Sequence, residues 1–208
     1  MPTTIDGVLF DMNGLFRHWR NAGARTSERH AGLPDGTIAR YAYDHPSYRL
    51  ARVGVITDQQ WAADVADRLA ADHGEHIRTA LEAWRNDRGE PVPEMVALLK
   101  HVRAQLPVGV LSNCTDALAD DLEYHGIVFD HTMASATLGV DKPSPHAFLL
   151  AAERMGIPCD KLAYFDDEPT FVAAARSVGM QAHLFTTPAD LSQHLKDIGI
   201  QTDEAPCP

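Results

Sequence analysis

The sequence has no run of about 18 consecutive apolar residues, the length that a membrane-spanning helix requires. Its first residues also lack a basic segment followed by an apolar stretch, so we expect neither a membrane partner nor a secretion signal. Positive charge is scarce, because 18 lysine and arginine residues are set against 29 acidic residues, for a formal net charge of −11. Such a surface repels nucleic acid and anionic lipid, so neither is an expected partner.

Cysteine is also rare. The three cysteines, Cys114, Cys159 and Cys207, are widely spaced and form no CxxC pair. An odd, dispersed set predicts reduced thiols and therefore a cytoplasmic setting. The rest of the composition, with 45% hydrophobic and 23% charged residues, is typical of a folded globular protein.

Short apolar runs that end in polar residues recur along the chain. They are residues 5–10, 107–111, 161–165 and 181–185, with a fifth run near 129–134. Their length and boundaries are those of buried parallel strands. Helical patterns separate the runs from about residue 91 onward. This alternation predicts an α/β fold with a Rossmann-like parallel sheet and helices on both faces.

The stretch from residue 17 to 90 interrupts the alternation. It contains no convincing buried strand, whereas residues 58–71 and 75–85 have helical patterns. We therefore predict a small helical cap over residues 17–90, inserted after the first strand of a core formed by residues 1–16 and 91–208. Our candidates for substrate contact lie in its most polar and aromatic part and are Tyr41, Tyr43, His45, Tyr48, Arg49 and Arg52.

Polar residues follow three of the predicted strands. Asp11 ends the first, Ser112 ends another, and Asp166 with Asp167 ends a third, while Lys142 lies in a loop that opens a helix. Because ligands bind beyond the carboxyl ends of parallel strands, these groups should converge on one crevice. Clustered carboxylates need a cation, and all-oxygen ligation favours Mg²⁺. A carboxylate nucleophile, a lysine and a hydroxyl beside a metal suit phosphoryl transfer.

The same segments resemble the four motifs of the haloacid dehalogenase-like hydrolase superfamily. VLFDMNG resembles the first motif, GVLSN the second, DKPSP the third, and YFDDEP followed by VAAARSVGM the fourth. The match covers about residues 5–15 and 91–185, in the order of the family. The position of the insertion is similar to that in the phosphatase-type subgroup with a small helical cap after the first motif.

This resemblance implies a magnesium site and a nucleophile. Asp11 is implied as the nucleophile and as a metal ligand, together with the backbone carbonyl of Asn13. Asp166 and Asp167 are implied to hold the Mg²⁺, and which of them ligates it directly stays open. The implied activity is that of a phosphatase or phosphotransferase that acts on a small phosphorylated molecule through an aspartyl-phosphate at Asp11.

The resemblance also implies a binding site for the phosphoryl group. Ser112 would bind the transferring group with help from the Asn113 amide, and Lys142 would hold both Asp11 and the phosphoryl oxygens. Lys142, Ser112 and Asn13 are thus candidate catalytic residues beside Asp11.

Two positions depart from the family pattern. Phosphatases of this family carry a second aspartate in the first motif, which protonates the leaving oxygen and then activates water; here that residue is Asn13. An amide cannot transfer a proton near neutral pH, and general acid–base catalysis is worth roughly 10²–10⁴-fold, so turnover should be slow. In the fourth motif, Phe171 replaces the asparagine of many relatives.

Three hypotheses follow from Asn13. The chain is a slow phosphatase for esters whose leaving group needs little protonation, or it takes its acid from elsewhere, for example from His18 or His45. Alternatively, it is a catalytically impaired binding or regulatory protein. Dehalogenation is disfavoured, because the dehalogenases of this family need no metal and usually lack the paired acids that Asp166 and Asp167 supply.

Overall fold

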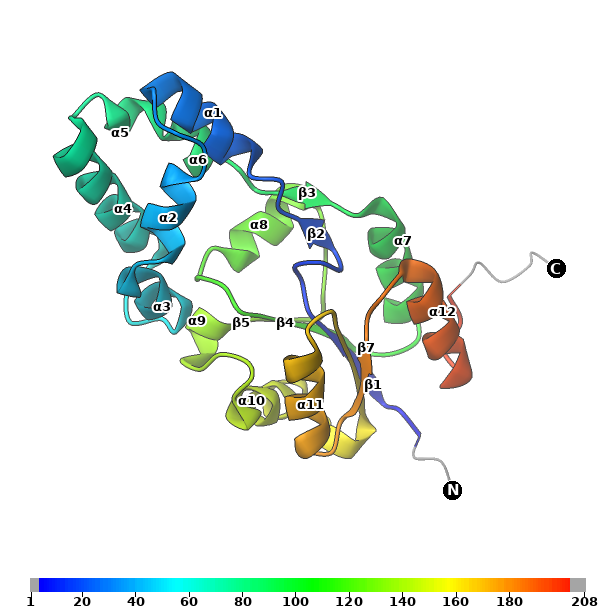
Figure 1. The fold of residues 1–208 in the computed structure, drawn as a ribbon. Helices are drawn as coiled ribbons and strands as arrows, with labels where there is room; N and C mark the ends of the chain where they lie inside the picture. The colour runs from blue at the N-terminus through cyan, green and yellow to red at the C-terminus, as the bar shows by residue number, and fades with distance from the viewer. Residues whose placement is uncertain (1–3, 203–208) are drawn as a thin grey trace.

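The computed structural model describes residues 4–202, and its centre is a five-stranded parallel sheet in the order β5-β4-β1-β6-β7 (Figure 1). The strands are β1 (Gly7–Phe10), β4 (Val108–Ser112), β5 (His131–Ala134), β6 (Leu162–Asp166) and β7 (Gln181–Leu184). Each strand overlaps the run that predicted it. The Rossmann-like α/β fold is therefore confirmed.

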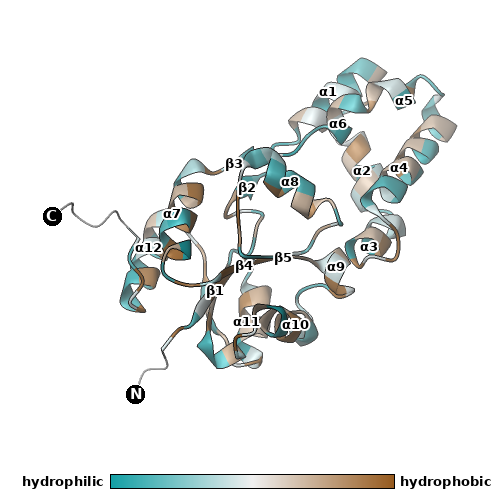
Figure 2. Cartoon of the chain, turned by 180° about the vertical axis from the view of Figure 1, so that it is seen from behind, coloured by the Kyte–Doolittle hydropathy of each residue, from teal (hydrophilic) through white to brown (hydrophobic). Residues whose placement is uncertain are grey.

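Helices cover both faces of this sheet (Figure 1). One face packs on α7 (Pro93–Arg103), α8 (Leu118–His125) and α12 (Pro188–Asp197), and the other on α10 (Pro145–Met155) and α11 (Pro169–Ser177). A short helix, α9 (Ser135–Leu138), follows β5, and a 3-10 turn at Cys159–Lys161 precedes β6. In Figure 2 the central strands are coloured mainly as hydrophobic, as expected for a sheet buried on both sides.

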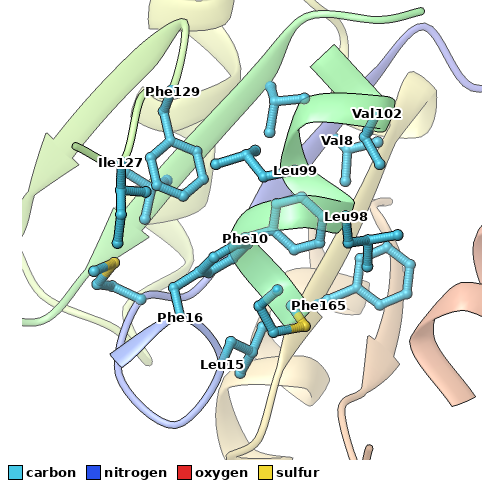
Figure 3. Packing of buried hydrophobic residues seen from close by; sticks show 14 of the residues in the cluster. Val8, Phe10, Leu15, Phe16, Leu98, Leu99, Val102, Ile127, Phe129 and Phe165 are labelled. Atoms are coloured by element: carbon cyan, nitrogen blue, oxygen red, sulfur yellow. The ribbon is translucent and has the colours of Figure 1, made fainter. Parts of the chain in front are cut away.

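Successive side chains of β1 point to opposite faces of the sheet. Val8 and Phe10 pack in one apolar cluster with Leu99 of α7, whereas Leu9 packs in the other with Phe148 of α10. Figure 3 shows the first of these clusters, where side chains of α7 lie over β1. This packing holds β1 in place between the two layers of helices and therefore positions the residues that follow the strand.

Residues 22–85 form a separate layer of helices, called the cap below, which Figure 1 shows as a lobe beside the core. They are α1 (Ala22–Ala31), α2 (Thr37–Tyr43), α3 (Pro46–Arg52), α4 (Asp58–His73), α5 (Ile77–Ala80) and α6 (Glu82–Arg85). The cap has its own apolar cluster around Trp61, Val65 and Leu69. None of the helices in the part of the chain that the structure describes is long and apolar enough to cross a membrane.

Two chain segments join the cap to the core, and they pair with each other. β2 (Arg17–His18) and β3 (Glu90–Pro91) form a short antiparallel ribbon. The cap also touches the core directly at Gly54, where an added methyl group would lie 2.1 Å from the carbonyl oxygen of Ala136 in α9. The cap is therefore seated against the loops at the carboxyl edge of the sheet.

Candidate active site

The ends of three neighbouring strands bring together the residues that the sequence singles out. Asp11 follows β1, Ser112 ends β4 and Asp166 ends β6. The backbone N–H of Asp11 donates to the carbonyl oxygen of Phe165 at 2.9 Å, which continues the pairing of β1 with β6. The side chains of Asp11, Ser112 and Asp166 are all buried. The three residues lie at one edge of the sheet because parallel strands in register end together.

Lys142 lies between two of the carboxylates. Its Nζ is 2.6 Å from Asp11 Oδ1 and 2.7 Å from Asp166 Oδ2, and 3.0 Å from the hydroxyl oxygen of Tyr164. The lysine is only 1% exposed. Burial alone lowers the pKa of Lys142, but the charges of Asp11 and Asp166 raise it above its ordinary value. The side chain therefore stays an ammonium ion that pairs with both acids.

Asn113 holds the loop that carries this lysine. Its Oδ1 accepts the backbone N–H of Lys142 at 2.8 Å, and its Nδ2 donates to the carbonyl oxygen of Lys142 at 2.7 Å. Phe171 also contacts the lysine, with its ring centre 4.8 Å from Nζ, a distance at which a cation and an aromatic face attract. Phe171, which departs from the family pattern, thus forms part of the surroundings of the Lys142 ammonium group.

The carboxyl of Asp11 loses its proton less readily than an ordinary aspartate. Burial raises the pKa of Asp11 to about 6, an effect that Lys142 opposes and Asp166 reinforces. Burial and the charge of Asp166 also raise the pKa of Asp167 above its usual value. A cation beside these acids would relieve both effects, because it stabilises the ionised forms.

The three acids are close enough to share one ion. Asp11, Asp166 and Asp167 each offer a carboxylate oxygen, and these oxygens lie within 4.8 Å of one another. Asp167 borders Gly14, whose φ is +86° and where an added methyl group would be 2.1 Å from Asp167 Oδ2. Only glycine tolerates that backbone conformation and that contact. Hard, anionic oxygen donors gathered in this way suit Mg²⁺.

Ser112 presents an unused hydroxyl at the same place. Its Oγ is buried and has no hydrogen-bond partner among residues 4–202. Leaving a buried hydroxyl unpaired costs about 1–3 kcal/mol, so the site needs a further polar group to satisfy it. A phosphoryl oxygen beside Asp11 is an acceptor of the required kind.

A cavity of about 730 Å³ reaches this cluster only through its neighbours Asn13 and Asn113, because none of the clustered acids, Lys142 or Ser112 is among the lining residues in the described part of the chain. The cap contributes aromatic side chains to its wall, namely Tyr43, Tyr48, Trp61 and Trp84. Of the six cap residues considered for substrate contact, Tyr43 and Tyr48 therefore line the cavity. The other four do not: Tyr41 bonds to Asp72, Arg52 pairs with Asp141, and His45 and Arg49 are exposed.

Neither histidine considered as an alternative acid lines the cavity within the described residues. His18 is exposed, and His45 caps α3 by accepting the backbone N–H of Ser47 at 3.3 Å. Cys114 does line the cavity, but burial raises the pKa of its thiol to about 12, so it stays protonated. Cys114 and Cys159 are free thiols, and Cys207 lies outside the described residues.

Sequence reasoning missed three contributors to the site. Tyr164 donates its hydroxyl to Asp166, and Arg17 and Trp19 each donate to the side-chain oxygen of Asn13. Tyr164 lies in β6, two residues before Asp166, so strand alternation could have placed both side chains on one face. Arg17 gave no such signal, because it looks like an ordinary surface residue in the sequence but is only 2% exposed.

Comparison with known proteins gives consistent matches. The family model for haloacid dehalogenase-like hydrolases matches residues 5–179. The chain is 30% identical over 189 residues to the fructose-1-phosphate phosphatase YqaB of Escherichia coli (strain K12), covering 85% of this chain and 94% of that protein. It is also 30% identical over 93 residues to the (S)-2-haloacid dehalogenase H-109 of Pseudomonas putida, covering 43% and 42% of the two chains.

The fold has counterparts among solved structures. The magnesium complex of the haloacid dehalogenase family enzyme bt-2542 from Bacteroides thetaiotaomicron superposes with a TM-score of 0.70 at 19% sequence identity. The match covers 92% of this chain and 98% of that one. At that identity the likeness concerns the fold.

Proposed function

Because the chain belongs to the haloacid dehalogenase-like hydrolase family and is thus a hydrolase, we propose that it is a magnesium-dependent phosphatase of small phosphate esters. The observation that carries the proposal is the buried group of Asp11, Lys142 and Asp166 beside the unpaired hydroxyl of Ser112. A nucleophile, a fixed cation and a free donor there match what a phosphoryl group requires.

Asp11 is the proposed nucleophile. Lys142 binds Oδ1, which leaves Oδ2 as the oxygen that attacks phosphorus. An Asp11–phosphorus bond forms as the ester P–O bond breaks, and the electron pair stays on the leaving oxygen. Water then attacks the aspartyl-phosphate and releases inorganic phosphate. Lys142 and the Ser112 hydroxyl stabilise the charge on the phosphoryl oxygens in both steps.

The residues at the strand ends fit a magnesium ion. Asp11, Asp166 and Asp167, with the backbone carbonyl of Asn13, are the proposed ligands. Bound Mg²⁺ supplies positive charge that offsets the acids and the phosphoryl group. The paired acids Asp166 and Asp167 also favour a phosphatase over a dehalogenase, because the dehalogenases of this family usually lack them. We further propose that residues 17–90 act as a cap that bounds the substrate cavity.

A phosphate-release screen tests this function. Many phosphate esters are incubated with Mg²⁺ and with wild type, Asp11→Asn or the control Asp35→Asn, which alters an exposed cap acid outside the cavity lining. We expect Mg²⁺-dependent release by wild type and the control, and a loss of at least about 10³-fold in Asp11→Asn. No release from any ester would replace the proposal with the hypothesis of a binding or regulatory protein.

A further inference from the structure

The side-chain amide of Asn13 has a fixed orientation. Its oxygen lies 3.1 Å from Nε of Arg17 and 3.1 Å from Nε1 of Trp19. Both of these nitrogens carry a hydrogen and neither can accept a hydrogen bond. The atom between them must therefore be the amide oxygen, because the reversed amide would face two donors with a third.

The two donors are themselves held in place. Arg17 is only 2% exposed, and its other end pairs with Asp121 at 2.6 Å. Asp121 also pairs with Arg88 at 2.6 Å, so one guanidinium group binds each oxygen of its carboxylate. The guanidinium carbon of Arg17 lies 4.5 Å from the ring centre of Trp19, where cation and aromatic face attract. Asn13 thus ends a chain of packed, charge-paired groups.

The opposite side of the amide is unused. Asn13 lines the cavity, and its Nδ2 donates no hydrogen bond within residues 4–202. Because the oxygen is fully engaged, the free N–H groups are the part of this side chain that a ligand can use. Residue 13 stands two positions after Asp11, so its side chain borders both the cavity and the strand end that carries the proposed nucleophile.

We infer that Arg17 and Trp19 are positioning residues that make Asn13 a permanent hydrogen-bond donor to the leaving-group oxygen of the substrate. The inference rests on the proposed phosphatase function. As the P–O bond breaks, its electron pair collects on the leaving oxygen, and the Nδ2–H group stabilises that charge without giving up its proton. The released anion takes its proton from water.

This role defines the class of substrate. Stabilisation by a hydrogen bond grows with the charge that the leaving oxygen carries. Because Asn13 cannot complete a proton transfer, esters that release a stable anion, such as aryl phosphates, are better substrates than alkyl phosphates. Among aryl esters, phenyl phosphate depends on the donor more than 4-nitrophenyl phosphate does, since nitrophenolate spreads its charge over the nitro group.

The test compares these two esters in wild type and Trp19→Phe, with Mg²⁺ present. The substitution removes the indole N–H but keeps a ring beside Arg17, and Trp19 is 43% exposed, so the fold should tolerate it. We expect kcat/KM, which reports the step that breaks the P–O bond, to fall about 5–10-fold further on phenyl phosphate than on 4-nitrophenyl phosphate. Asn13→Ala should change that ratio at least as much, and Arg17→Lys should change it in the same direction.

Arg88→Gln is the matched control. It removes an ion pair with the same Asp121 but no contact with Asn13. Whatever its effect on the overall rate, it should leave the ratio of the two esters unchanged. Equal losses on both esters in Trp19→Phe and Asn13→Ala would overturn the inference while the phosphatase function stands. Failure of wild type to hydrolyse either ester would overturn both.

Discussion

At the scale of single residues, Asp11 couples the proposed chemistry to pH. Burial raises its pKa to about 6 from an ordinary value of 3.8, so without a metal the folded protein binds this proton more tightly than the unfolded chain. The stability that this proton contributes is complete below about pH 4 and is lost as the pH rises through about 6. Asp11→Asn cannot ionise and avoids this loss.

We therefore predict that Asp11→Asn gains stability relative to wild type between pH 4.5 and pH 7 in the presence of EDTA. The expected gain is on the order of 2 kcal/mol, and urea unfolding at the two pH values measures it. A stability difference that does not change with pH would show that the Asp11 carboxyl is not raised in the folded state.

Bound Mg²⁺ should offset the loss of stability that ionised Asp11 causes at higher pH. A bound divalent ion needs ionised ligands, so Mg²⁺ should raise the Tm of wild type more at pH 7.5 than at pH 5. Thermal unfolding with millimolar Mg²⁺ measures this, and Asp167→Asn should reduce the shift by removing one of the three clustered acids. An equal shift at both pH values in both proteins would place the ion elsewhere.

We expect Asn13 to limit the turnover of the proposed phosphatase. Asn13→Asp provides a carboxylate that can take a proton from the attacking water, while one of its oxygens still accepts from Arg17 and Trp19. We predict that steady-state turnover of aryl phosphates rises by part of the roughly 10²–10⁴-fold acid–base contribution. Stopped-flow kinetics should also show a smaller initial burst than in wild type, because water attack is faster. A slower Asn13→Asp enzyme would show that the amide donor outweighs the base.

Residue positions in this site differed in how far the sequence revealed them. Asp11, Ser112 and Asp166 are placed by their strands, and strand ends can be read from short apolar runs. The pair of Arg17 and Asp121 joins residues 104 positions apart, and neither has a local pattern that names its partner. Such contacts depend on how segments far apart in the sequence pack together, which only the three-dimensional structure shows.

At the scale of elements, the cavity between cap and core has an acidic wall. Its lining carries Arg17, Arg85 and Arg88 against five aspartates, Asp58, Asp87, Asp116, Asp120 and Asp121. Each of the three arginines is already paired with an aspartate, at 2.6–2.8 Å. A second anionic group on a substrate would therefore find carboxylates and no free guanidinium among these lining residues.

We predict that the enzyme discriminates against leaving groups with a second negative charge. The KM for 4-carboxyphenyl phosphate should exceed that for phenyl phosphate by roughly tenfold, because the added carboxylate faces like charges. Asp120→Asn, which neutralises an exposed acid of the lining, should narrow the difference. Equal KM values in wild type would mean that the leaving group does not enter this cavity.

The cap helices show why sequence patterns failed in part. The predicted helix at residues 75–85 is broken at Leu81 into α5 and α6, and α1, α2 and α3 were not predicted individually. These are short helices that pack against one another, so tertiary contacts rather than long apolar periodicity define them. The core elements were readable because each strand is a continuous apolar run buried on both faces.

At the scale of the whole molecule, buried positive charge is paired with carboxylates, Arg17 with Asp121 and Lys142 with two acids of the site. The chain carries a net charge of −11, yet Lys142 is almost fully buried between Asp11 and Asp166. The cap rests on the same edge of the sheet, and Arg52 of α3 pairs with Asp141, the neighbour of Lys142. The loop that carries Asp141 and Lys142 thus connects the cap to the site.

Beryllium fluoride tests the proposal that Asp11 receives a phosphoryl group beside a magnesium ion. This complex mimics a phosphoryl group on an aspartate, and ¹⁹F NMR distinguishes bound from free fluoride. We predict bound resonances in wild type with Mg²⁺, their loss on addition of EDTA, and none in Asp11→Asn. Absence of bound resonances in wild type with Mg²⁺, or their persistence in Asp11→Asn, would show that Asp11 does not receive the phosphoryl group.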